Sequence, residues 1–375
     1  MPALKGKFEF RKNQRATRRS LLFALGYCLM LSTVLSSCGE AKNNTQQSSA
    51  SPESVAASNT TEKSTKKQVV RIVRSKQLTA LAVLEKQGSL EKRLEPLGFK
   101  VQWPEFAAGP QQLEAVNANG LDIAFTAESP PVFSQAAGAP LVYLATTHPS
   151  GKSISLLVPV NSPIKSVKDL KGKKVAFQKA SIGHYLLVKA LEDAGLKLSD
   201  VQSVFLAPAD ANAAFSQNKV DAWYIWEPFA TRNVQNKIAR VLADGGKLRD
   251  TGNFYSTSRQ FYQAHPDVIK VFLEELEKAE IWTKNHPKEV AQLLAPVTQL
   301  DPPTLEIMHK KYDYGLVPIT DKTITKQQEV ADKWYSLGLI PKKVNVKDGF
   351  LTPEEYAKIT PSEVLANKSL SPRTN

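Results

Sequence analysis

Cysteine is nearly missing from this sequence, and its scarcity excludes several kinds of site. Only Cys28 and Cys38 occur among 375 residues. Two cysteines can form neither a disulfide scaffold nor a cysteine-ligated zinc site. Glycine (18) and proline (23) are too few for a fibrous or wholly disordered chain. The sequence therefore predicts a globular protein that folds around an apolar core.

Motifs of common enzyme classes are also absent. The sequence contains no Gly-x-Gly-x-x-Gly, no Gly-x-x-x-x-Gly-Lys-Ser/Thr, no Gly-x-Ser-x-Gly and no His-Glu-x-x-His. Its five histidines have no metal-ligand spacing. We therefore expect no catalytic residue, no metal and no cofactor, and interpret the polar turns described below as binding sites.

Positive charge is in excess, with 49 Lys and Arg against 36 Asp and Glu and a net charge of +13. Such an excess raises the question of nucleic acid or anionic membrane as a partner. The chain has no basic tract with interleaved aromatics, so we expect no nucleic acid partner. With 42% hydrophobic residues, it can bury enough surface for about two domains.

The first 37 residues have the organisation of a bacterial lipoprotein signal peptide. Seven cations and one acid precede an apolar run from Leu21 to Leu35, which is shorter than the ~20 residues of a spanning helix. The run ends in Leu35-Ser36-Ser37-Cys38, which resembles a lipobox. We expect removal of residues 1–37, lipidation of Cys38 and export to the periplasmic face of a membrane; a membrane anchor helix is the alternative. Arg18-Arg19 leaves open the twin-arginine or the general export route.

Residues 38–67 are expected to be a flexible tether behind the lipidated cysteine. The segment is rich in Ser, Thr, Asn and Gln, and it cannot bury enough apolar surface to offset its ordering entropy. Residues 1–37 carry a net charge of +6, so their removal would lower +13 to +7. Nearly half of the excess charge is therefore assigned to export.

From Val69 onward, short strands alternate with helices. Strands are predicted at 69–73, 99–103, 121–125, 141–145, 154–158, 174–177, 201–206 and 220–226, with helical patterns between most of them. After Ser258 the pattern is almost entirely helical. Two successive series of this kind predict an α/β protein with two lobes and largely parallel sheets.

Three turns at strand ends offer binding groups. Phe177 to Gly183 and Thr126 to Pro130 each join a strand to a helix, where free N–H groups and the helix dipole favour anions. A helix cap is the simpler role of Ser181. Trp223 to Pro228 places aromatics at a strand end, where they would pack in the core or cover an alkyl group. Lys76 either neutralises an anion or is a solvated surface charge.

Five dispersed stretches resemble the aliphatic sulfonate-binding proteins of bacterial ABC importers, within the nitrate, sulfonate and taurine group. They occur in the family's order along residues 69–350: Glu105 to Ala115, Ser129 to Ala139, Ser162 to Ala176, Pro208 to Ala211, and Val220 to Pro228. The resemblance implies a type II periplasmic-binding-protein fold, in which two α/β lobes are joined by two hinge strands. Lobe 1 would comprise 68–157 and the returning residues 253–375, lobe 2 would comprise 158–252, and the hinge strands would be Ile154 to Val158 and Phe254 to Ser258.

The resemblance also implies a ligand pocket between the lobes. Its residues would be Lys76, Gln77, Thr126, Glu128, Ser129, Gln178, Ser181, His184, Trp223, Trp226 and Glu227. The expected ligand is a small organic anion with a sulfonate group, and the expected partners are an ABC permease and its ATPase, with the binding protein acting as a monomer. Taurine, nitrate, bicarbonate or a thiamine-precursor pyrimidine remain alternative ligands. A ligand sensor, or an enzyme related to pyrimidine-forming synthases, remains an alternative role.

Overall fold

The computed structural model describes residues 67–366. The predicted signal peptide, Cys38 and nearly all of the predicted tether lie outside this range. None of the helices formed by residues 67–366 is both apolar and long enough to cross a membrane.

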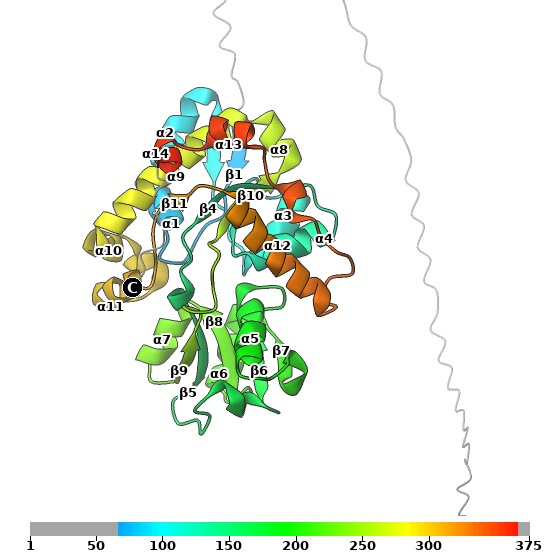
Figure 1. Ribbon diagram of the computed structural model, residues 1–375. Helices are drawn as coiled ribbons and strands as arrows, with labels where there is room; N and C mark the ends of the chain where they lie inside the picture. The colour runs from blue at the N-terminus through cyan, green and yellow to red at the C-terminus, as the bar shows by residue number, and fades with distance from the viewer. Residues whose placement is uncertain (1–66, 367–375) are drawn as a thin grey trace, which may run out of the picture. The chain divides into compact units, whose positions relative to one another are not determined.

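The first lobe is built on two small sheets and the helices that flank them (Figure 1). One sheet pairs two parallel strands, β1 (Gln68–Arg71) and β2 (Phe99–Gln102). The other has the order β11-β4-β10-β3, and a parallel bridge between Ile72 and Ile123 connects the two. Its strands are β3 (Ala124–Thr126), β4 (Leu141–Thr147), β10 (Phe254–Ser258) and β11 (Leu316–Val317). The early helices of this lobe are α1 (Ala80–Gln87), α2 (Ser89–Leu94), α3 (Gly109–Asn117) and α4 (Ser129–Ala136).

The second lobe is a five-stranded sheet with the order β7-β6-β8-β5-β9 and three helices, drawn in green shades in Figure 1. Its strands are β5 (Ile154–Pro159), β6 (Lys174–Phe177), β7 (Gln202–Phe205), β8 (Ala222–Trp226) and β9 (Ala239–Asp244). Its helices are α5 (Ile182–Asp193), α6 (Pro208–Ser216) and α7 (Phe229–Gln235). An aromatic cluster with Trp223 at its centre packs Phe215 and Phe229 on one face of the sheet.

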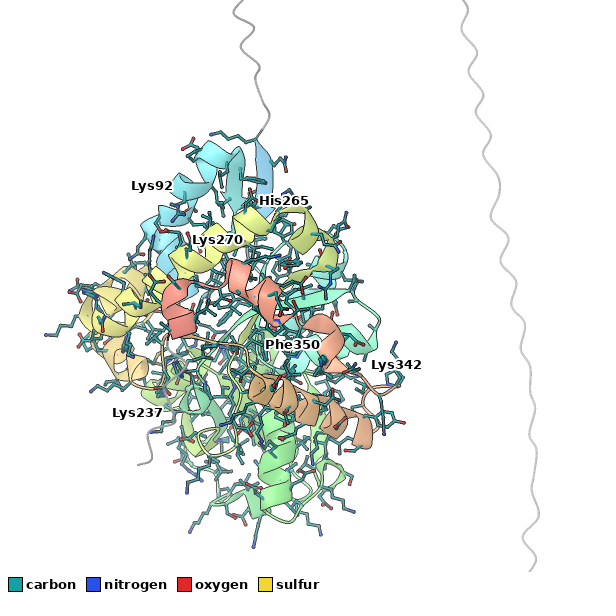
Figure 2. All side chains as sticks on the ribbon, turned by 45° about the horizontal axis from the view of Figure 1, so that its top comes forward. Lys92, Lys237, His265, Lys270, Lys342 and Phe350 are labelled. Carbon is teal, nitrogen blue, oxygen red and sulfur yellow. The ribbon has the colours of Figure 1, made fainter. Side chains whose placement is uncertain are left out.

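The last third of the described chain returns to the first lobe. Helix α9 packs against α1 and α2, and α10 and α11 bury Leu294, Leu305 and Met308 against α1. Phe350, labelled in Figure 2, stacks on Tyr143 of β4 with ring centroids 4.2 Å apart. These returning helices are α8 (Arg259–Ala264), α9 (Pro266–Asn285), α10 (Pro287–Thr298), α11 (Pro302–His309), α12 (Asp321–Ser336), α13 (Pro353–Ile359) and α14 (Ser362–Ala366).

The two-lobed α/β prediction is confirmed, whereas the prediction of largely parallel sheets is wrong. Strand β5 is antiparallel to β8 and β9, and β10 is antiparallel to β3 and β4. Strands β5 and β10 each follow a segment in which the chain passes from one lobe to the other. Each therefore runs through its new sheet in the direction opposite to that of its neighbours. Strands β9 and β11 were not predicted. They have six and two residues and lie at sheet edges, where a clean alternation of buried and exposed residues is not required.

The chain crosses between the lobes twice, through residues 148–153 and 245–253. Strand β5 pairs only within the second sheet, so the crossing precedes Ile154 rather than residue 158. The expected hinge strands, β5 and β10, directly follow the two crossings. The crossings touch backbone to backbone: Gly245 N donates to Gly151 O (3.2 Å), and a Cβ at Gly151 or Gly252 would overlap the backbone of Gly245 or Thr147. Glycine is needed here because the two segments lie so close.

Candidate functional site

A cavity of about 600 Å³ is lined by residues of both lobes and of both crossings. Its volume is typical of a small-molecule site. From the first lobe it takes the ends of β1 and β3 and the beginning of α3, and from the second lobe the beginnings of α5, α6 and α7. Ser153, Arg249 and Asn253 of the crossing segments complete the lining.

Several helices begin at the cavity wall. The N-caps of α3, α5 and α6, which are Ala108, Ser181 and Ala207, all line the cavity, and so does Pro130 in the first turn of α4. The first N–H groups of a helix have no partner within the helix, and the positive end of its dipole favours an anion. The backbone therefore makes this cavity favourable for a negatively charged group.

The charged lining is mostly positive, with the four cations Arg74, Lys76, Arg232 and Arg249 and the one acid Glu105. Lys76 pairs with Glu105 at 2.6 Å, and both side chains are about half exposed (57% and 48%). Arg74 pairs with Glu85 at 2.8 Å. Pairs that reach the solvent in this way contribute little in water.

Arg249 is the most deeply buried of these cations. Its side chain is 1% exposed and forms an ion pair with Glu128, which is fully buried. The guanidinium Nε and Nη2 both donate to Oε2 of Glu128 (3.2 and 2.9 Å), and Nη2 also donates to Oδ1 of Asn253 (2.7 Å). Gln327 donates to the backbone oxygen of Glu128 (2.7 Å), which fixes the turn that carries the acid.

Helix α7 of the second lobe is joined to α10, α11 and the residues after them by polar contacts. Arg232 donates to the carbonyl oxygen of Thr298, and Gln235 donates to the hydroxyl of Thr304. Lys311 lies 2.5 Å from Oε1 of Glu227, whose carboxylate also accepts from the N–H and hydroxyl of Thr231 (2.9 Å each). These contacts hold the lobes together beside the cavity.

Apolar surfaces line other parts of the cavity. Trp226, at the end of β8, is partly buried, and Phe106, Phe125 and Phe229 line the same space. Aromatic faces of this kind can cover an alkyl or ring portion of a ligand. The cavity thus combines an anion-favouring surface with an apolar one.

Two buried hydroxyl groups belong to residues that line the cavity. Thr126 and Tyr312 are lining residues, and the buried Oγ1 of Thr126 and OH of Tyr312 have no partner among residues 67–366. Burial, helped by the nearby Glu227, raises the pKa of Tyr312 well above its usual value, so its hydroxyl remains a neutral donor. Ser181, by contrast, donates to the carbonyl of Gln178 (2.7 Å) and accepts from the N–H of His184 (3.4 Å). Ser181 is therefore a helix cap that also lines the cavity.

Of the eleven expected site residues, the structure brings five to the cavity: Lys76, Gln77, Thr126, Ser181 and Trp226. The other six do not line it. Glu128 and Glu227 are bound by cations from distant parts of the chain, and Trp223 is in the core of the second lobe. Ser129 and Gln178 have a buried side-chain oxygen without a partner in the described chain, and neither residue lines the cavity.

His184 is buried within an aromatic contact between the lobes. Its ring lies 4.7 Å from those of Phe177 in the second lobe and Trp334 in α12, and Nδ1 accepts from the N–H of Ala180 (3.3 Å). Burial, with a smaller contribution from Lys179, lowers the pKa of His184 to about 4. A neutral histidine outside the cavity gives no support to the alternative in which it works as an active-site residue. No group of three or more His, Cys, Asp or Glu within residues 67–366 could hold a metal ion.

Sequence reasoning missed Arg232, Arg249 and Tyr312 as lining residues. Arg232 is in the second turn of α7, and Arg249 follows Gly245 and Gly246 in the second crossing. The adjacent glycines Gly245 and Gly246, shortly before Arg249, are the signal that could have identified the crossing. Nothing local indicates that Glu128, 121 residues earlier, is the partner of this arginine.

Comparison with known proteins agrees with this geometry. The family description NMT1/THI5 like matches residues 97–290. The chain belongs to the NMT1/THI5-like family. A relative from Escherichia coli (strain K12), named for aliphatic sulfonate binding, is 39% identical over 289 residues, which are 77% of this chain and 90% of the relative. The resemblance to aliphatic sulfonate-binding proteins stated from the sequence is thereby confirmed.

Solved structures of this family share the two-lobed fold. The alkanesulfonate-binding protein from Xanthomonas axonopodis pv. citri bound to MOPS is 35% identical, with a TM-score of 0.73 over 76% of this chain and 99% of that chain. The periplasmic aliphatic sulphonate-binding protein from Escherichia coli is 38% identical, with a TM-score of 0.68 over 77% of this chain and 99% of that chain. The periplasmic-binding-protein fold of this family member is therefore established.

Proposed function

We propose that this protein is an exported solute receptor that binds an aliphatic sulfonate in the cavity between its lobes and releases it unchanged. The observation that carries the proposal is one cavity of about 600 Å³ that joins helix N-termini and four cations, of which Arg249 is buried, to an aromatic surface. The relatives named for sulfonate binding support the ligand class.

The polar surface of the cavity suits a permanently charged oxyanion. A sulfonate presents three acceptor oxygens and no donor at neutral pH, and helix N–H groups and Arg249 present donors. The MOPS molecule bound by the Xanthomonas protein is itself a sulfonate.

The apolar surface suits a tail attached to that anion. Trp226 and Phe229 from the second lobe face the same cavity as Phe106 and Phe125 from the first. Burial of the tail contributes about 0.8 kcal/mol per methylene. We therefore expect a C2–C8 alkanesulfonate to bind more tightly than an ion without a tail, such as nitrate or bicarbonate.

Delivery to an ABC permease and its ATPase is the transport role that we propose for the loaded receptor. We also propose that the receptor acts as a monomer, anchored at the periplasmic face by lipidated Cys38, after residues 1–37 are removed. The anchor rests on the sequence of those residues alone.

Calorimetric titration of the purified exported protein tests the binding proposal. Alkanesulfonates from C2 to C8, taurine, nitrate and bicarbonate are titrated in turn, and product analysis follows incubation with each sulfonate. We expect heat from the sulfonates, tighter binding as the chain lengthens, and full recovery of the ligand. If only nitrate or bicarbonate gives heat, or if the sulfonate is consumed, the proposal is wrong.

A further inference from the structure

Arg249 differs from the other cations of the cavity in how its donors are used. Arg74 and Lys76 pair with carboxylates at exposed positions, and Arg232 donates to a backbone carbonyl across the lobes. The guanidinium of Arg249 is almost fully buried, and water therefore screens its charge least. Of these four cations, Arg249 is the one that water screens least, and the charge of Glu128 opposes it on one edge only.

One edge of the Arg249 guanidinium is occupied and the other is free. Nε and Nη2 bind Glu128 and Asn253, whereas Nη1 has no hydrogen-bond partner among residues 67–366. Nη1 is not among the buried side-chain atoms without a partner, so it keeps accessible surface. Because Arg249 lines the cavity, a ligand oxygen could accept from this free edge.

Hydrogen bonds hold both the backbone of Arg249 and its partner Asn253 in place. Its own N–H donates to Gly245 O (2.9 Å) within the crossing. Asn253 accepts through its backbone oxygen from Thr146 Oγ1 and from the N–H of Thr147 (3.0 Å each) on β4. The guanidinium is thus held in place before a ligand arrives, and this lowers the entropic cost of binding.

We propose that Arg249 recognises the sulfonate group directly and that Glu128 and Asn253 are positioning residues that aim its free edge into the cavity. The inference rests on the proposed function and deepens it, because it assigns the recognition of charge to a residue of the crossing between the lobes. Glu128, expected from the sequence to contact the ligand, acts on it through Arg249.

The experiment compares two variants that keep the size of the side chains. Removing Arg249 alone would leave Glu128 buried without a cation and would endanger folding. The double variant Glu128→Gln/Arg249→Gln replaces the ion pair by two neutral amides. Glu128→Gln alone keeps an oxygen that accepts from Arg249, and Arg259→Gln, on α8 outside the cavity lining, is the matched control.

Each variant is titrated with 1-butanesulfonate and with its neutral analogue 1-butanesulfonamide, and its folding is checked by thermal unfolding. For the folded double variant we expect a 10- to 100-fold higher Kd for the sulfonate, as for the loss of a charge-assisted hydrogen bond, with less than a threefold change for the sulfonamide. Glu128→Gln should bind the sulfonate as tightly as the wild type or more tightly, and the control should be unchanged.

The outcomes separate this inference from the proposed function. If the wild type does not bind butanesulfonate, the proposed function fails. If the wild type binds it and the double variant binds it equally well, or if the double variant loses both ligands to the same degree, the role of Arg249 is wrong. If folded Glu128→Gln loses the sulfonate, the carboxylate does more than hold Arg249 by a hydrogen bond, and the positioning role is wrong.

Discussion

The turns after β3 and β8 carry the same kind of residue and use it differently. Each places a fully buried glutamate directly after a strand, Glu128 in the first lobe and Glu227 in the second. Each glutamate is bound by a cation from a distant part of the chain, Arg249 and Lys311 respectively. Both acids were predicted from the sequence to contact the ligand.

The two cations show why the pairs have different roles. Arg249 is 1% exposed and belongs to a crossing segment, so its pair with Glu128 requires only the first lobe and that crossing. Lys311 is 29% exposed and follows α11 of the first lobe, so its pair with Glu227 requires both lobes at their present separation. An acid at a strand end thus holds a cavity-lining cation in one lobe and takes part in a contact between the lobes in the other.

Arg249→Gln alone is expected to have the largest effect on stability. The substitution leaves Glu128 buried without its cation, which should lower the free energy of unfolding by about 3–5 kcal/mol. Denaturant unfolding of the ligand-free protein measures the change. The double variant Glu128→Gln/Arg249→Gln is the control, since it removes the stranded charge and should recover much of the loss. A double variant no more stable than the single one would contradict this explanation.

A third buried acid, without a cation, extends the comparison. Glu280 of α9 accepts from the N–H of Gly315 (3.0 Å), and burial, with a smaller effect of Glu277, raises its pKa to about 8. The folded protein then keeps this proton to a higher pH than the unfolded chain, so stability falls as pH rises from about 5 to above 8.

Glu280→Gln should flatten this dependence. Between pH 6.5 and 8.5 the wild type should lose about 2 kcal/mol of stability that the variant does not lose. His184, whose pKa is lowered to about 4, and Glu277, whose pKa burial raises to about 7, are present in both proteins, so their contributions largely cancel in the difference. Unfolding curves at several pH values provide the measurement, and Glu289→Gln, at an exposed position of α10, is the control. Identical slopes in the variant and the wild type would assign the pH dependence to another group.

Lys311→Gln should have a smaller effect on stability than Arg249→Gln. Glu227 keeps its two hydrogen bonds from Thr231, and the partly buried Lys311 is better solvated than Arg249, so we expect a loss of about 1 kcal/mol. The ligand-free variant should also be more open, because a contact between the lobes is lost. Small-angle X-ray scattering measures the opening, and Lys310→Gln, at the exposed neighbouring position, is the control. A scattering curve equal to that of the wild type would exclude a role of this pair in closure.

Local signals account for what the sequence predicted well. Helix α5, in the helical pattern between the strands predicted at 174–177 and 201–206, is observed at Ile182–Asp193, because Ser181 caps its first turn and Gly195 takes a left-handed conformation beyond its end. Thr126, Ser181 and Trp226 were identified from the same kind of signal, a change of pattern at a strand end, and they line the cavity.

Contacts between distant segments account for what was missed. The direction of β5 and β10 depends on where the chain crosses between the lobes, and no residue within either strand encodes it. Likewise the partner of Glu128 lies 121 residues away and that of Glu227 lies 84 residues away. From the sequence alone, a glutamate after a strand is therefore predicted to contact a ligand. Only the fold shows that a distant cation binds it.

The smallest expected effects are on ligand affinity. They distinguish residues that contact the sulfonate group from residues that contact the alkyl tail. Thr126→Val removes a buried donor that has no partner in residues 67–366 and keeps the side-chain shape. It should raise the Kd of every alkanesulfonate by about 2- to 10-fold, whatever the chain length. Trp226→Leu, at the end of β8, should instead weaken the binding of longer chains more than that of shorter ones, because it removes apolar contact. If both variants showed the same dependence on chain length in calorimetry, the two turns would contact the same part of the ligand, and the division of the cavity into an anion end and a tail end would be wrong.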